Sequence, residues 1–397
     1  MVPRLSPWVA SARRFFAVLT LALTQAACAS TDVPAEQVTV YGAPGLNFGA
    51  LVPVRRPAAE VFPQQVAAIT SGVPMGRPLV VTARPAAIAP IMAQAAMASS
   101  APAPTASAEM CGLSLLTRVQ MQPMSGGTML APVTLENAPR LMLVDTGGVT
   151  SQLWESTAKK FHFPEHRGSR DLIDVDGNIS NKAVRVDRFR VGALQNQDID
   201  FQIYPNQAVS LGDERIVGLL APNLFAAYDI DFDFGANTLS YFSQEHCDGK
   251  IQHWPAATVA VIPFTMPSGH ISIPVTIDGH KLTAIIDTGA SNTIMTMNAA
   301  KTVFGLTSDS NNMESLGVMP GGAPIYRHAF ANLLFEGVSV SNPRIVLISD
   351  MTGKPINTGG NLPDVIIGMD VIKNLHIYIA FKEKKIYASQ VSPAEIR

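Results

Sequence analysis

The sequence predicts an all-β protein built from two related lobes, and three observations support this fold class. The first is that the triplet Asp-Thr-Gly occurs twice, at Asp145 and at Asp287, each time after a short apolar run. The second is an ungapped repeat, since an offset of 142 residues separates both Pro132 from Pro274 and Asp145 from Asp287. The third is the alternation of apolar and polar residues between turn signals, which is typical of strands. A long unit that occurs only twice predicts two lobes related by a pseudo-twofold axis, which would bring Asp145 and Asp287 together.

Each aspartate is expected at the end of a buried strand, where the following glycine marks a tight turn. A carboxylate in such a place is costly unless it is paired or hydrogen-bonded. Downstream of each triplet, two apolar residues precede a glycine, in Ile216-Val217-Gly218 and in Ile366-Ile367-Gly368. Two triplets in a repeated context, each followed by this second motif, form a far more specific signal than one Asp-Thr-Gly.

These motifs resemble the aspartic protease superfamily of the pepsin and retroviral-protease type, over both halves of the chain from about Cys111 onward. The resemblance implies the two-lobed pepsin/retropepsin-like fold. It further implies a role for each motif residue: Asp145 and Asp287 as the catalytic pair, Thr146 and Thr288 as hydrogen-bonding links between the two loops, Gly147 and Gly289 as positions where backbone amides approach the carboxylates, and Gly218 and Gly368 as the psi-loop glycines that leave room for those loops.

Two close carboxylates supply the chemistry of peptide hydrolysis without a metal or another cofactor. Because like charges at short distance do not ionise together, one proton is shared and one apparent pKa rises. The ionised carboxylate takes a proton from water, and the protonated one donates to the carbonyl oxygen. Gly148 departs from the resemblance, because Ser, Thr or Ala usually follows the first triplet. We expect the missing hydroxyl to move the working pH upward.

The strand pattern repeats in both halves. In the first lobe we expect a hairpin turning at Glu136-Asn137, a flap whose turn is Asp176-Gly177, and final strands at 226–232 and 239–242. In the second lobe we expect a hairpin turning at Asp278-Gly279, a glycine-rich segment at 317–325 that is either a second flap or an ordinary loop, and a terminal hairpin at 375–388.

Composition and the N-terminus indicate an exported protein. The 397 residues are 47% hydrophobic, enough for packed cores, and the net charge of −2 gives no reason to expect nucleic-acid binding. Residues 1–29 resemble a signal peptide, with arginines, an apolar run at 15–23 and small residues before the exit. An uncleaved anchor is the alternative. Cys28 permits a second interpretation, a periplasmic lipoprotein attached to the membrane at this thiol, although Gln25 does not fit a lipobox.

The remaining sequence divides into three parts. Residues 30–110 are rich in Ala and Pro and predict a linker, with a removable pro-segment as the alternative. The first lobe is expected at 111–250 and the second at 251–397. Cys111 and Cys247 bracket the first lobe, so in an oxidising compartment we expect them to form a disulfide, two unrelated thiols being the alternative.

Two other groups of residues resemble metal sites, and each has a simpler explanation. The string from His162 to His166 matches H-x-x-E-H, but Pro164 interrupts the helix that this zinc motif requires. Asp229, Asp231 and Asp233 alternate along one strand, and a solvated strand face explains them more simply than a cation site. The sequence therefore predicts a monomeric aspartic endopeptidase that acts on protein or peptide substrates. The alternative is a non-catalytic envelope module of the same fold that binds peptides or cell-wall components.

Overall fold

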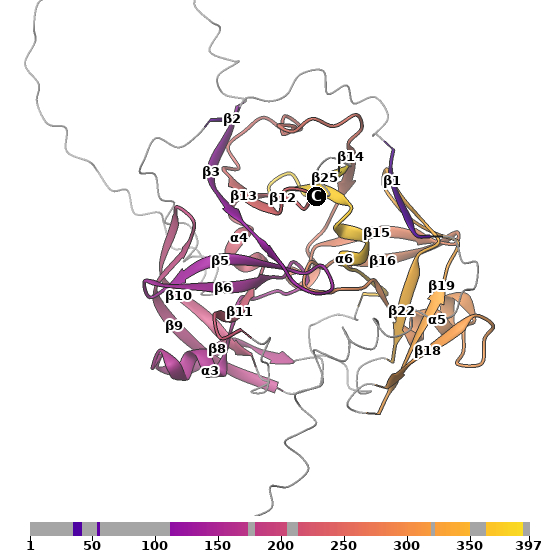
Figure 1. Ribbon diagram of the computed structural model, residues 1–397, viewed down its shortest axis with the longest axis horizontal. Helices are drawn as coiled ribbons and strands as arrows, with labels where there is room; N and C mark the ends of the chain where they lie inside the picture. The colour runs from indigo at the N-terminus through magenta and orange to yellow at the C-terminus, as the bar shows by residue number, and fades with distance from the viewer. Residues whose placement is uncertain are drawn as a thin grey trace, which may run out of the picture.

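The computed structural model describes residues 35–41, 54–55, 112–173, 179–204, 213–318, 322–349 and 363–391, which form three β-sheets and a few short helices (Figure 1). Two sheets belong to the two halves of the chain and lie on opposite sides in Figure 1, and the third lies between them. The fold is all-β and two-lobed, as the repeat predicts.

The first lobe contains an eight-stranded sheet in the order β4-β5-β6-β11-β7-β10-β9-β8. Its β5–β6 hairpin turns at Glu136 and Asn137, whose positive φ angles of 47° and 68° suit a two-residue turn between twisted strands. The strands are β4 (Gln122–Pro123), β5 (Met129–Leu135), β6 (Ala138–Val144), β7 (Gln152–Trp154), β8 (Glu165–Ile173), β9 (Ile179–Val191), β10 (Leu194–Tyr204) and β11 (Ile216–Leu220).

The second lobe repeats this sheet with two strands more, in the order β1-β21-β20-β15-β16-β23-β17-β22-β19-β18. The pairings β6–β11, β11–β7 and β7–β10 are parallel, antiparallel and parallel, and β16–β23, β23–β17 and β17–β22 follow the same sequence. The strands are β1 (Gln37–Val40), β15 (Ser272–Ile277), β16 (His280–Ile286), β17 (Ile294–Thr296), β18 (Met313–Val318), β19 (Pro324–Ala329), β20 (Asn332–Phe335), β21 (Val338–Ser341), β22 (Arg344–Ile348) and β23 (Val365–Ile367).

The third sheet joins the two halves. Strand β12 from the first half pairs antiparallel with β24 from the second, so that Ile230 lies opposite Ile379. Large buried side chains such as Phe232 and Tyr378 come from these two central strands. The strands, in sheet order, are β14 (Ala260–Pro263), β25 (Lys385–Gln390), β24 (Leu375–Ala380), β12 (Asp229–Asp233), β13 (Thr238–Phe242), β3 (Leu113–Gln120) and β2 (Val54–Arg55).

Short helices follow β7, β11, β17 and β23, and a 3₁₀ turn follows β14. They are α3 (Glu155–Lys160), α4 (Pro222–Phe225), α5 (Met297–Phe304), α6 (Met369–Ile372) and the 3₁₀ turn η4 (Pro267–Gly269). Helix α5 begins where the Thr296 hydroxyl accepts from the Ala299 N–H, and it ends at Gly305 with a φ of 67°. No helix in the described ranges is long and apolar enough to cross a membrane.

Within residues 30–110, residues 37–40 form a strand. Strand β1 pairs antiparallel with β21 at the edge of the second-lobe sheet. Val38 and Val40 are buried, while Gln37 and Thr39 between them are exposed. Side chains from the body also hold the strand, since Gln390 donates to the Val38 carbonyl and Thr258 to the Val40 carbonyl. This alternation lets a short segment bury two valines in an otherwise Ala- and Pro-rich region.

Asp229 and Asp231 differ from the prediction, because the strand face that carries them is buried rather than solvated. Both side chains lie inside the third sheet. Asp231 lies 2.6 Å from His376 and 3.4 Å from His253, and Asp229 accepts from the Tyr378 hydroxyl and lies 2.6 Å from His246. Burying a carboxylate requires such partners, and the histidines come from segments remote in sequence. The pattern of the strand alone did not reveal them.

Candidate active site

The two aspartates of the repeated triplets meet at the junction of the lobes. Asp145 directly follows β6 and Asp287 directly follows β16. Their N–H groups donate to equivalent carbonyls on the adjacent parallel strands, at 2.9 Å to Leu220 and at 3.0 Å to Ile367. The two carboxyl groups hydrogen-bond to each other. The repeat therefore places one carboxyl group from each lobe at one point.

Thr146 and Thr288 tie the two loops together through four hydrogen bonds. The Thr146 N–H donates to the Thr288 hydroxyl oxygen at 3.1 Å, and the Thr288 N–H donates to the Thr146 hydroxyl oxygen at 3.0 Å. Each hydroxyl then donates to the opposite lobe, Thr146 to the Ile286 carbonyl at 2.7 Å and Thr288 to the Val144 carbonyl at 2.8 Å. Both side chains are buried, so this network holds the aspartates at a fixed separation.

Glycines next to the aspartates leave space for the opposite carboxyl group. A methyl group on Gly147 would overlap the carboxyl group of Asp287, and one on Gly289 would lie 2.8 Å from Cγ of Asp145. Backbone N–H groups from the same loops hold the carboxylates. Gly148 donates to Oδ1 of Asp145 at 2.7 Å, and Gly289 donates to Oδ1 of Asp287 at 2.8 Å. Close approach of backbone and carboxylate is the physical need that glycine meets here.

The psi-loop glycines sit beside the chain that leaves each catalytic loop. A side chain at Gly218 would overlap the carbonyl of Gln152, and a side chain at Gly368 would overlap the carbonyl of Asn292. Gly218 lies inside β11, whereas Gly368 follows β23 and directly precedes α6. The registers pair Leu220 with Val144 and Ile367 with Ile286, so Ala221, and not Gly218, holds the position equivalent to Gly368. The predicted equivalence of the two glycines is therefore wrong, although each lacks room for a Cβ.

The electrostatics of the pair are asymmetric. Burial raises the pKa of Asp145, which is offset by hydrogen bonds from the Gly148 N–H, Asp287 and the Gly147 N–H and by the nearby charge of His270. Burial also raises the pKa of Asp287, and the adjacent charge of Asp145 raises it further, well above its usual value. The two carboxyl groups therefore share one proton, and their titration is a property of the pair.

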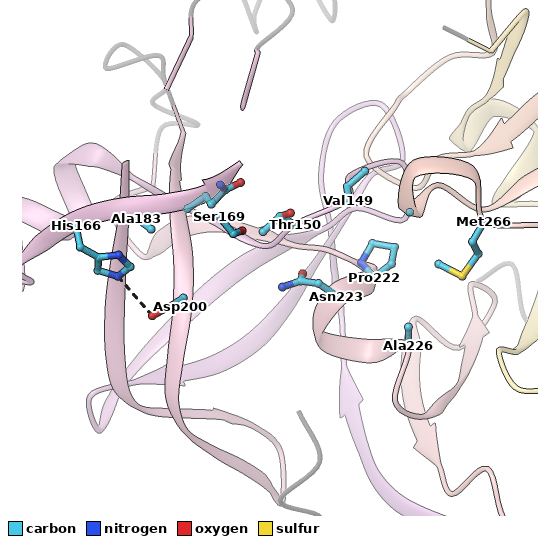
Figure 2. A pocket seen from close by; sticks show the side chains of 12 residues that line it. Val149, Thr150, His166, Ser169, Ala183, Asp200, Pro222, Asn223, Ala226 and Met266 are labelled. Atoms are coloured by element: carbon cyan, nitrogen blue, oxygen red, sulfur yellow. Dashed lines mark ion pairs between the residues drawn. The ribbon is translucent and has the colours of Figure 1, made fainter. Parts of the chain in front are cut away.

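A pocket of about 200 Å³ lies next to the catalytic loop and between the lobes (Figure 2). Val149 and Thr150 come from the catalytic loop, Asn223 from the start of α4, and Met266 from the second lobe. Its first-lobe end is polar, where His166 lies 3.4 Å from Asp200, and its other end is apolar (Figure 2). Such a pocket beside the first catalytic loop has room for one side chain of an extended ligand.

Two further polar pairs connect the chain after each catalytic loop to helices α4 and α6, and the sequence motifs did not identify these pairs. In the first lobe, Ser151 donates through its N–H and its hydroxyl to Oδ1 of Asn223, at 2.7 and 2.8 Å. In the second lobe, Thr293 donates in the same way to the two carboxylate oxygens of Asp370, both at 2.8 Å. Ser151 and Thr293 are related by the 142-residue offset of the repeat, so extending the alignment past the triplets would have found both hydroxyls.

The other predicted site residues lie as follows. Cys247 is disulfide-bonded, but Cys111 and Cys28 lie outside the described residues, so the pairing with Cys111 stays a prediction. The flap turn at Asp176-Gly177 and residues 1–29 lie outside them as well. His162 occupies a turn after α3 and His166 lies on β8, so the two do not share a helix face.

The comparisons with known proteins agree with this geometry. The family model described as aspartyl protease matches residues 131–221 and 273–371, two regions that each contain an Asp-Thr-Gly triplet. No curated protein matches the sequence. The two matched regions correspond to the two sheets that carry Asp145 and Asp287. The chain therefore belongs to the aspartyl protease family.

Proposed function

We propose that this protein is an exported aspartic endopeptidase in which Asp145 and Asp287 activate a water molecule. The observation that carries the proposal is the hydrogen bond between two carboxyl groups of unequal pKa, held by the threonine network at the junction of two lobes. Membership of the aspartyl protease family supports protease activity in general. Export is inferred from residues 1–29, and the cleavage of internal peptide bonds from the position of the pair between the lobes.

The proposed reaction uses each carboxyl group once. Asp145, the ionised member, removes a proton from water, and the water oxygen attacks the carbonyl carbon of the peptide bond. Asp287 transfers its proton to the carbonyl oxygen, which gives a neutral tetrahedral intermediate. Asp145 then returns its proton to the amide nitrogen while the carbon–nitrogen bond breaks, and Asp287 recovers a proton from the intermediate's hydroxyl group. Charge thus stays within the buried pair throughout the cycle.

The substrate class follows from the surroundings of the pair. An extended polypeptide can pair its backbone with nearby strands, and its side chains can alternate between pockets on the two lobes. The pocket that contains Thr150 and Asn223 receives one of these side chains. Because this pocket has an apolar and a polar end, we expect a preference there for a side chain with an apolar stem.

The test is peptide cleavage by the purified full chain between pH 3 and pH 8, with a library of internally quenched peptides. We expect hydrolysis by the wild type and a loss of at least about a thousandfold in Asp145→Asn and in Asp287→Asn. Asp309→Asn, which changes an exposed carboxylate, is the matched control and should retain activity. Equal cleavage by wild type and both active-site variants would exclude this function. Peptide binding without cleavage would instead favour the envelope-binding module.

A further inference from the structure

His270 reaches from the second lobe into the catalytic loop of the first. It lies between η4 and β15, and its Nδ1 is 2.8 Å from the Gly147 carbonyl oxygen. A carbonyl oxygen only accepts hydrogen bonds, so Nδ1 of His270 carries a proton and donates it. The neighbouring Gly269 packs so closely against Val149 that a methyl group there would overlap the valine side chain. The contact is therefore part of a packed interface between the lobes.

The peptide group that His270 contacts is the one that holds Asp145. The Gly147 carbonyl and the Gly148 N–H belong to a single rigid plane. On the far side of that plane, the Gly148 N–H donates to Oδ1 of Asp145 at 2.7 Å. Hydrogen bonds in a chain polarise one another, so a donor on the carbonyl makes the N–H a stronger donor. His270 thus acts on the carboxylate through one peptide group and fixes the direction of its N–H.

The hydrogen-bond relay from His270 through the Gly147–Gly148 peptide group to Asp145 has no equivalent at Asp287 among the described residues. The 142-residue offset relates His270 to Thr128, and within the described residues the Thr128 side chain forms no hydrogen bond across the interface. The N–H groups of Gly289 and Ala290 hold Asp287 without an imidazole behind them. The two carboxyl groups therefore receive similar backbone hydrogen bonds, and His270 is the feature that distinguishes Asp145.

Among the residues that the structure describes, two charged groups bear on the surroundings of His270. Asp145 interacts with its charge from the catalytic loop of the first lobe. Lys384 comes from the turn between β24 and β25, and its Nζ lies 5.5 Å from the centre of the Phe264 ring at the start of the same segment. Residues 264–271 contain no other ionisable side chain. When protonated, His270 places a positive charge beside Asp145, which favours the ionised carboxylate.

We propose that His270 is a positioning residue that makes Asp145 the ionised member of the catalytic pair, by holding and polarising the Gly147–Gly148 peptide group. This inference rests on the proposed function, because it assigns roles within the same pair. It predicts that removing the ring changes the pH dependence of the reaction more than it changes substrate binding.

Two substitutions in the full chain separate the donor from the charge. His270→Asn keeps an N–H donor near the position of Nδ1 but is neutral at every pH, and His270→Leu removes both. His280→Asn is the matched control, since His280 begins β16 at the end remote from Asp287. For each protein, kcat and KM are measured from pH 3 to pH 8 with one peptide that the wild type cleaves.

For His270→Leu we expect the acidic limb of kcat/KM to move up by about one pH unit, with kcat about tenfold lower and KM little changed. For His270→Asn we expect a smaller upward movement and kcat within about threefold of the wild type, because the donor remains. His280→Asn should match the wild type. An unchanged acidic limb in His270→Leu overturns the proposal, whether kcat is kept or lost.

A measurement independent of activity separates this proposal from the proposed function. Carbon-13 NMR of protein labelled at the aspartate carboxyl carbons follows the titration of the pair, and Asp145→Asn identifies its signal. We expect the apparent pKa of Asp145 to rise in His270→Leu, and no change would overturn the proposal. If the wild type cleaves no peptide but the signal moves as expected, the peptidase function fails while the role of His270 stands.

Discussion

Replacing Thr288 by valine tests how strongly the threonine network holds the two lobes together. Valine has nearly the same shape, so the substitution removes the hydroxyl without opening a cavity. Two hydrogen bonds disappear, the one accepted from the Thr146 N–H and the one donated to the Val144 carbonyl. Both partners stay buried, because residues 144 and 146 have no measurable exposure.

The expected size of the effect follows from those two orphaned groups. A buried polar group left without a partner costs about 1–3 kcal/mol, so Thr288→Val should lower the free energy of unfolding by about 2–6 kcal/mol. Thr146→Val removes two equivalent bonds and should cost about the same. Thr288→Ser, which keeps the hydroxyl, should cost less than about 1.5 kcal/mol.

Urea unfolding followed by tryptophan fluorescence measures these differences, and kcat on a quenched peptide follows the aspartates. We expect Thr288→Val and Thr146→Val to lose activity together with stability, because both loosen the separation of the carboxyl groups. If Thr288→Val unfolded at the same urea concentration as Thr288→Ser, the network would not hold the lobes and the reasoning would be wrong.

Three further predictions concern groups whose ionisation the structure controls. A Cβ at position 148 would lie 3.1 Å from Oδ2 of Asp145, so Gly148→Ser places a hydroxyl beside this carboxylate. The acidic limb of kcat/KM should then move to lower pH, whereas Gly148→Ala, which adds no hydroxyl, should leave the acidic limb in place. Burial alone would raise the pKa of Asp231, but the charges and hydrogen bonds of His376 and His253 hold this pKa well below its usual value of 3.8. The ionised Asp231 therefore stabilises the fold above pH 3.8, and this contribution is lost in stronger acid. Asp231→Asn should therefore cost about 3–5 kcal/mol in urea unfolding at pH 7 and should flatten the loss of stability below pH 4, and a wild-type slope in the variant would contradict this. Burial, together with the charge of Asp370, raises the pKa of Glu36 from 4.5 to about 7. Attachment of β1 should therefore be strongest below pH 4.5 and weaken as the pH rises from 4.5 through 7. Hydrogen exchange at residues 37–41 measures this, and Glu36→Gln should abolish the pH dependence.

Much of the catalytic centre was predictable because its residues occur in short, repeated motifs. Asp145 and Asp287 each end an apolar strand, and the common offset of 142 residues implies that they are equivalent. The hairpin at Glu136-Asn137 was equally accessible, because a two-residue turn depends on the φ angles of those residues alone. In these cases the local structure is determined by a few residues that are neighbours in the sequence.

Other features depended on partners that no local pattern names. The strand with Asp229 and Asp231 resembles a solvated face until His246 and His376, from other segments, are packed against it. The valines of β1 alternate for only four residues, too few to distinguish a strand from a linker until the edge of β21 is available.

The repeat and its motifs were therefore sufficient to infer two lobes, the catalytic pair and its threonine and glycine supports. The three-dimensional structure was needed for the asymmetry of the pair, because His270 reaches Asp145 through a peptide group 123 residues away in sequence. The symmetry of the two lobes follows from motifs that occur twice in the sequence, so it can be predicted from the sequence. The difference between the two aspartates depends on the side chain of His270, which crosses from one lobe to the other. Only the packed interface between the lobes brings this side chain to the Gly147 carbonyl.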